Sequence, residues 1–263
     1  SISKEECDNI ENEECDFYIL NVFHVMSFAA DNMLVPEIGE IAYKSAKETS
    51  EEELLNTLNN YQKKNISRHK FFAISKFNSL LNSIDEAIEE YNIDLIVMGT
   101  QGATNAKGII FGSNTVMVME KERSCPVLAI PAEVNYLKPK EIVFPTSYEK
   151  PYNKEEINYL IEIAKMNNAA IRVLHVNGDE PINKSQEDHK NQLIAYFEGL
   201  EYSFHTINNV ELQIALDVFV QSRNSDMIAF INKKHGFLDS IFTSHLVQEL
   251  GYKSKVPVLT LHN

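Results

Sequence analysis

Apolar residues follow two different spacings along this chain. Short continuous runs, such as Leu-Ile-Val-Met at residues 95–98, are typical of strands that are covered by helices on both faces of a parallel sheet. Between such runs, apolar residues recur at helical spacing, as in Ile157, Leu160 and Ile161. Strands and helices that alternate in this way predict an α/β fold built on a parallel, doubly wound sheet.

The two spacings place strands and helices along most of the chain. In the first half they predict strands at 17–25, 70–75, 95–98 and 127–130, and helices at 51–64, 79–91 and 114–121. In the second half they predict strands at 141–144, 171–176, 202–207, 227–231 and 258–261, and helices at 154–166, 185–199, 210–222 and 242–250.

The two halves repeat one pattern. Asp94 opens an apolar run in the first half, and Asp226 opens a similar run 132 residues later. Pro126 and Pro257 each precede Val-Leu, and they lie 131 residues apart. A shared offset of this size indicates a tandem duplication rather than the shorter periods of a solenoid. We therefore predict two domains, residues 1–135 and 136–263.

The first half starts differently from the second. The strand at 141–144 begins 35 residues before Val176, whereas an equal step back from Val25 falls before Ser1. We therefore expect the first half to lack its opening strand. Residues 1–16 are acidic and weakly periodic, and the pattern leaves open a remnant of a helix or a frayed tail.

The charge balance argues against some partners. Lysine and arginine number 24 against 38 aspartates and glutamates, and this net charge of −14 argues against nucleic acid and an anionic membrane surface. No apolar run approaches the roughly 20 residues of a membrane-spanning helix, and the polar start does not resemble a secretory signal. Three cysteines, Cys7, Cys15 and Cys125, do not make a disulfide framework. We therefore expect a reducing, cytoplasmic location.

Glycines that follow the apolar run at 95–98 form the candidate chemical site. Gly99, Gly102 and the pair Gly112-Ser113 give the spacing Gly-x2-Gly-x9-Gly-Ser between a predicted strand and a predicted helix. Glycines let the backbone approach a ligand closely, and the N–H groups at the start of a helix favour phosphate. The spacing favours nucleotide binding, with turn and capping glycines as the alternative. The sequence contains neither a P-loop motif nor Gly-x-Gly-x-x-Gly.

This spacing resembles the ATP-binding motif of the universal stress protein family. The Asp-Leu-Ile-Val-Met-Gly run at 94–99, the Pro-Val-Leu ending of each half and Val-Phe-Pro-Thr at 143–146 are also similar to that family, in its tandem two-domain form. The resemblance implies an adenine nucleotide alpha-hydrolase-like fold, with a parallel sheet of strand order 3-2-1-4-5 in each domain. It also implies that the domains pair through their last strands, 127–130 and 258–261. Because strand 1 is central in this order, its loss in the first half would split strand 2 from strand 4.

The resemblance further implies a bound adenine nucleotide, which is ATP, with AMP or ADP as alternatives, and Mg²⁺ held through the phosphates. The implied cofactor-binding residues are Val25 near the adenine, Met98 and Gly99 near the ribose, Gly102, Gly112, Ser113 and Asn114 at the phosphates, and Thr115. We predict no catalytic residue and no metal ligand from the protein itself.

The second half departs from the motif. Residues 231–234, Ile-Asn-Lys-Lys, replace the glycine segment 99–102, and Ser147 stands where the family usually has an aspartate near the nucleotide. We therefore expect a degenerate second domain that does not bind ATP in the family manner. The expected function is a stress-response regulator or sensor that binds an adenine nucleotide in its first domain. A non-nucleotide interaction or dimerisation module and a slow ATPase remain alternatives, and the sequence is compatible with a monomer or a homodimer.

Overall fold

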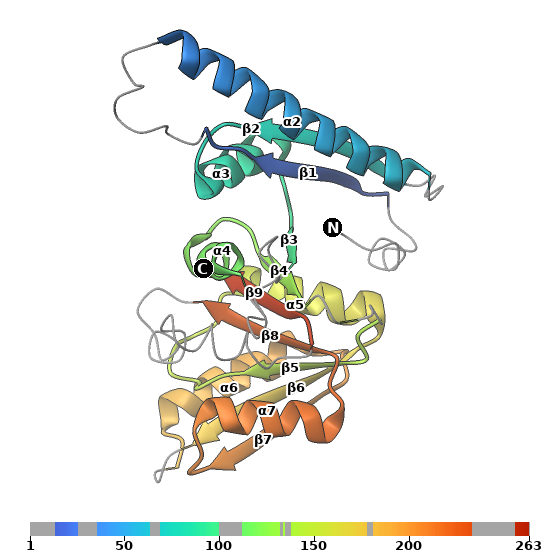
Figure 1. Ribbon diagram of the computed structural model, residues 1–263. Helices are drawn as coiled ribbons and strands as arrows, with labels where there is room; N and C mark the ends of the chain where they lie inside the picture. Colours follow the sequence, from blue (N-terminus) through green and yellow to red (C-terminus); the bar gives the residue numbers. More distant parts are fainter. Residues whose placement is uncertain are drawn as a thin grey trace. The chain divides into compact units, whose positions relative to one another are not determined.

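The computed structural model describes residues 14–25, 36–63, 69–99, 112–131, 134, 138–177, 181–232 and 256–262. Helices and strands alternate along the chain, as predicted for an α/β fold (Figure 1). The chain divides into two compact units between Asn92 and Ile93. The first unit contains a two-stranded sheet, and the second contains a seven-stranded sheet.

The first unit is a small sheet with one helix on each face. It consists of β1 (Asp16–Val22), α2 (Pro36–Gln62), β2 (Lys70–Lys76) and α3 (Leu80–Tyr91). The two strands are parallel, and their side chains alternate between the faces. Tyr61 of α2 stacks on Phe71 at 5.2 Å between ring centroids, whereas Tyr91 of α3 stacks on Tyr18 at 4.6 Å. Helices α2 and α3 therefore cover opposite faces, as Figure 1 shows.

Helix α2 is longer than the sequence predicts. It begins at Pro36, whereas the predicted helix begins at residue 51. Proline is favourable at the first helical position because the N–H that it lacks has no partner there. Ile41 and Tyr43 are exposed, so the early turns of α2 bury no clear apolar stripe that the sequence pattern could reveal.

The seven-stranded sheet of the second unit runs in the order β3-β4-β9-β8-β5-β6-β7. Its strands are β3 (Ile96–Gly99), β4 (Val127–Ile130), β5 (Glu141–Pro145), β6 (Ala170–Asn177), β7 (Tyr202–Asn208), β8 (Met227–Asn232) and β9 (Val258–His262). Strands β5 to β9 come from the second half, and they are parallel neighbours in the order third, second, first, fourth, fifth. This is the order implied for the second domain. Each strand of this half agrees with its prediction to within one residue at either end.

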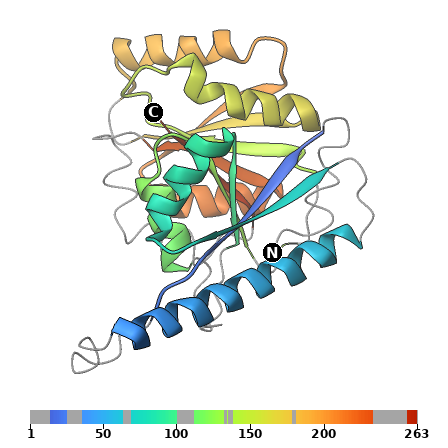
Figure 2. The ribbon, with the colours of Figure 1, turned by 90° about the horizontal axis from the view of Figure 1, so that it is seen from above.

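Helices of the second half cover both faces of its strands. They are α5 (Lys154–Asn167), α6 (Lys184–Tyr196) and α7 (Leu212–Arg223). Asn153 caps the start of α5, and Asn183 forms a capping box with Gln186 at the start of α6. Helices α5 and α6 share one apolar core with the sheet, and α7 lies across the opposite face (Figure 2). The predicted helix at 242–250 lies outside the described residues.

The two halves meet through their last strands. Strand β4 pairs with β9 in antiparallel orientation, from Val127 opposite Thr260 to Ala129 opposite Val258. Val127, Ala129 and Leu259 are all completely buried. The implied pairing of the last strands is therefore confirmed within the chain.

The strands of the first half are divided between the two sheets. Among the described residues, β1 pairs only with β2, and β3 pairs only with β4. This is the split expected for a domain without its central opening strand. The compact units consequently divide at residue 92, because β3 and β4 join the sheet of the second half. The duplication boundary at 135/136 stays a prediction.

Candidate functional site

The carboxyl end of β3 carries the first glycine of the motif. Gly99 is the last residue of the strand, and a Cβ atom placed on it would meet no atom of the described residues within 4 Å. Gly199 is the one described glycine with a positive φ, so Gly99 has a conformation that other residues adopt. The absence of a side chain at Gly99 therefore leaves open space beside the backbone, where a ligand can approach.

Helix α4 (Ser113–Lys121) carries the second part of the motif at its start. Its N-cap is Gly112, with φ −64° and ψ 151°, and a glycine offers no side chain to cap the first turn. Ser113 and Asn114 are exposed. The first N–H groups of a helix have no partner within the helix, and the positive end of the helix dipole lies beside them. The start of α4 can therefore bind an anion.

Thr115 joins the two parts of the motif. Its hydroxyl donates a hydrogen bond of 2.8 Å to the carbonyl oxygen of Gly99, and the residue is buried. This bond holds the first turn of α4 against the end of β3. The sequence alone gives no sign of this contact, because it joins residues that lie 16 positions apart.

The structure brings together most of the predicted cofactor-binding residues. Met98, half-buried, and Gly99 end β3, and Gly112 to Thr115 start the helix that Thr115 ties to that strand. Val25 is half-buried and belongs to the other compact unit. Gly102 lies outside the described residues.

Comparison with known proteins identifies a family for the part of the chain that carries this site. The model of the Universal stress protein family matches residues 7–131. This chain carries a universal stress protein domain. No curated protein sequence matches the chain.

Solved structures of universal stress proteins are similar to the chain over its whole length. One from Archaeoglobus fulgidus DSM 4304 has 18% sequence identity and a TM-score of 0.67, covering 98% of this chain and 89% of that one. A protein from Pseudomonas aeruginosa UCBPP-PA14 assigned to the same family has 12% identity and a TM-score of 0.58, covering 95% and 93%. A universal stress protein in complex with cAMP matches 47% of this chain and 97% of its own, at 15% identity and a TM-score of 0.37. At these identities the likeness shows the α/β fold alone.

The end of α4 in the universal stress protein domain is held by residues of the second half. The side-chain amide of Asn232 donates to the carbonyl oxygens of Met119 at 2.9 Å and Glu120 at 3.2 Å. The Arg123 guanidinium contacts the Asn232 carbonyl oxygen and His262 Nδ1, both at 3.3 Å. We call Asn232, Arg123 and His262 the α4 clasp.

Burial lowers the pKa of His262 in the α4 clasp. Burial, followed by the charge of Arg123, lowers the pKa of His262 to about 4, although the Glu122 carboxylate opposes the shift. His262 Nε2 is buried and has no hydrogen-bond partner within the described part of the chain. The imidazole is therefore neutral at physiological pH.

The second half closes the position that corresponds to Gly99. Ile231 is buried in the core shared with α5 and α6, and Asn232 is committed to the α4 clasp. A side chain therefore lies at this end of β8, whereas the equivalent end of β3 has open space. Lys233 and Lys234 lie outside the described residues.

Side chains of β6, of α6 and of the loop itself pack around the loop after β5. His175 is buried, and its Nδ1 donates to the Thr146 carbonyl oxygen at 2.9 Å. The ring of Tyr148 packs on the ring of His175 at 4.7 Å between centroids. The backbone of Tyr148 has a φ of +58°. The Ser147 carbonyl oxygen accepts a hydrogen bond from Gln186. The carbonyl oxygens of Thr146 and Ser147 thus have side-chain partners from β6 and α6.

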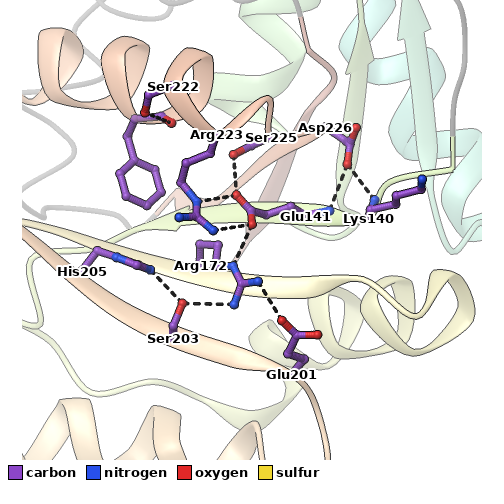
Figure 3. A network of polar contacts seen from close by, with 11 residues as sticks. Lys140, Glu141, Arg172, Glu201, Ser203, His205, Ser222, Arg223, Ser225 and Asp226 are labelled. Carbon is purple, nitrogen blue, oxygen red and sulfur yellow. Dashed lines mark hydrogen bonds and ion pairs between the residues drawn. The ribbon is translucent and has the colours of Figure 1, made fainter.

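A charged network ties the amino ends of the strands in the second half (Figure 3). Glu141, the first residue of β5, accepts hydrogen bonds from Arg172 at 2.8 Å, from Arg223 at 2.7 Å and from the Ser225 hydroxyl at 2.8 Å. Burial raises the pKa of Glu141, but the hydrogen bonds from Arg223, Arg172 and Ser225 outweigh it and lower that pKa to about 2. Because the network lies at the edge opposite the ends of the strands where ligands bind, its role is structural.

Two remaining observations bear on chemistry. Cys125 is buried, and burial, followed by the charges of Glu122 and Asp94, raises the pKa of its thiol to about 12, so it is unreactive. Among the described residues, no three His, Cys, Asp or Glu side chains gather as a metal site. In that same part of the chain, every helix is too short or too polar to cross a membrane.

Proposed function

We propose that the universal stress protein domain binds ATP, or AMP or ADP in its place, and that the chain serves as a regulator or sensor in a stress response in the cytoplasm. The uncapped start of α4, tied directly to the end of β3, carries this proposal. Helix starts with free N–H groups are suited to phosphate.

The residues at this position fit a nucleotide. Ser113 and Asn114 expose hydrogen-bonding side chains beside the free N–H groups of the first turn. The open space next to Gly99 suits a sugar or phosphate that passes close to the backbone. Mg²⁺ would be held by the phosphates of the nucleotide, whose charge it would partly neutralise.

The second half serves as a structural partner in this proposal. Ile231 fills the position that Gly99 leaves open, and Asn232 binds the universal stress protein domain rather than a ligand. One nucleotide for each chain is therefore expected.

Calorimetry with ATP and Mg²⁺ tests the site through Ser113→Asp. The positive end of the helix dipole stabilises an aspartate in the first turn, so the fold is retained. The same carboxylate repels phosphate, so ATP is expected to bind at least about tenfold more weakly. Gln213→Asp, in the first turn of α7, is the matched control because it adds the same charge at the start of another helix. The control is expected to bind ATP like the wild type.

The outcomes separate the alternatives. Equal ATP binding by Ser113→Asp and the wild type would remove α4 from the site. A wild type that binds none of ATP, ADP or AMP would favour the interaction module, which sedimentation would then test. Release of phosphate by the wild type, lost with Ser113→Asp, would identify a slow ATPase.

A further inference from the structure

Helix α4 is held at both ends by side chains. At its start, Thr115 donates to the Gly99 carbonyl oxygen at 2.8 Å. At its end, Asn232 donates to the carbonyl oxygens of Met119 and Glu120. The helix has nine residues and is therefore about 13 Å long. Such a short helix moves as one piece, so its two attachments together fix where its first turn points.

The chemistry of Asn232 matches its place. The last carbonyl groups of a helix lack partners within the helix, and the amide of Asn232 supplies donors for two of them. Asn232 is 8% exposed, so water does not readily replace it. Its own carbonyl oxygen accepts from Arg123, which directly follows the turn that ends α4. Asn232 is therefore fixed through both its side chain and its backbone.

Asn232 occupies the position in the predicted duplication that corresponds to Thr100 in the first half. Asn232 follows Ile231 as Thr100 follows Gly99, so it lies where the motif of the first half would begin its loop. In the second half, a residue at a ligand-binding position has become a contact with the other half.

We propose that Asn232 is a positioning residue for the phosphate-binding start of α4. This inference rests on the proposed function, because it assumes that the phosphates lie at Ser113 and Asn114. Without the Asn232 amide, the described contacts that still hold α4 are the Thr115 bond, the packing of its buried face and the Arg123 contacts just beyond its end. The last carbonyl groups of the helix then lose their donors, and the N–H groups of its first turn shift from the end of β3. By linkage, a bound nucleotide strengthens the Asn232 contact.

Asn232→Asp tests the inference because it keeps the shape of the side chain and removes both N–H donors. We expect ATP, titrated with Mg²⁺ by calorimetry, to bind this variant roughly 3- to 30-fold more weakly than the wild type. Ser225→Ala is the control: Ser225 precedes β8, at the end of the strand away from α4, and its hydroxyl donates to Glu141. Its ATP affinity is expected to stay within about twofold of the wild type.

Adenosine distinguishes positioning from general destabilisation. It lacks phosphates, so its affinity for Asn232→Asp is expected to equal that for the wild type. Equal weakening of ATP and adenosine would overturn the inference, as would unchanged ATP binding by a folded Asn232→Asp. If Asn232→Asp does not fold, Asn232→Ser, which keeps one donor, replaces it and is judged by the same two ligands.

Failure of the inference is distinct from failure of the proposed function. A wild type that binds no ATP removes both. If the wild type binds ATP through Ser113 and the Asn232→Asp variant binds it equally well, only the proposed role of Asn232 is rejected. Thr115→Val removes the other attachment of α4 and, like Asn232→Asp, is expected to weaken the binding of ATP.

Discussion

Strands β3 and β8 occupy equivalent positions in the predicted duplication but have different neighbours. Strand β8 lies between β5 and β9, whereas β3, within the described ranges, pairs with β4 alone. The aspartates that precede these strands differ in the same way. Asp226 accepts hydrogen bonds from the N–H groups of Lys140 at 2.7 Å and Glu141 at 3.0 Å, at the start of β5. Asp94 is exposed.

The two halves therefore carry different parts of the pattern that the sequence predicts for both. The first half keeps the open strand end and uncapped helix that suit phosphate, but its strands are divided between two sheets. The second half keeps a complete five-stranded sheet, but Ile231 closes the position of the motif. A complete sheet and an open ligand-binding end are therefore separable properties of this fold.

The largest effect is expected from Glu141→Ala. It leaves the largely buried Arg172 without one of its two carboxylate partners, and we expect a loss of about 4 kcal/mol in the free energy of unfolding. Urea unfolding monitored by circular dichroism measures this loss. The control in the other sheet is Glu86→Gln, which removes an exposed ion pair with Lys76 and should cost less than about 0.5 kcal/mol. Similar losses would show that the charged network does not distinguish the halves.

The same carboxylate predicts an acid response. The folded pKa of Glu141, about 2, lies below its ordinary value of 4.5, so its contribution to stability is present above pH 4.5 and is lost as the pH falls toward 2. Glu141→Gln should flatten the dependence of the unfolding free energy on pH across this window.

The boundary between the halves is expected to weaken in mild acid. His262 has a folded pKa of about 4 against an ordinary value of 6.5, so the unfolded chain binds more protons between these pH values. Stability should fall by about 2 kcal/mol as the pH drops from 6.5 to 4, since protonation places a second positive charge beside Arg123. Thermal unfolding across this range measures the fall. His262→Gln should remove most of it, and an unchanged slope would assign the effect to other groups.

A smaller effect compares the two equivalent aspartates directly. Asp226→Ala removes two hydrogen bonds from a carboxylate to the backbone of β5 and should cost about 1.5 kcal/mol in the free energy of unfolding. Asp94→Ala, at the exposed equivalent position, should change stability by less than about 0.5 kcal/mol. Equal costs from urea unfolding would mean that Asp94 has a partner comparable to that of Asp226.

Strands β5, β6, β8 and β9 were predictable from sequence because both of their faces are largely buried. Continuous apolar runs mark such strands, and the runs of the second half end at the observed strand ends to within one residue. The pairing of β4 with β9 followed from the family resemblance. The split of the first half followed from the strand spacing, which left no room for an opening strand, together with the strand order that the resemblance implies.

Contacts between distant polar residues were not predictable in the same way. Glu141, Arg172 and Arg223 meet only because the crossover order brings β5, β6 and the end of α7 together. Asn232 reaches α4 only after β9 has joined β4. In the sequence, each of these is an ordinary polar residue beside an apolar run, and nothing in that pattern names its partner.

Because β4 and β9 belong to one polypeptide, their association is an intramolecular step whose equilibrium does not depend on protein concentration. Each of these strands already has a neighbour on both sides. Dilution therefore leaves the two halves of one chain together. The partner of the universal stress protein domain is fixed when the chain is synthesised, however scarce the protein is in the cell.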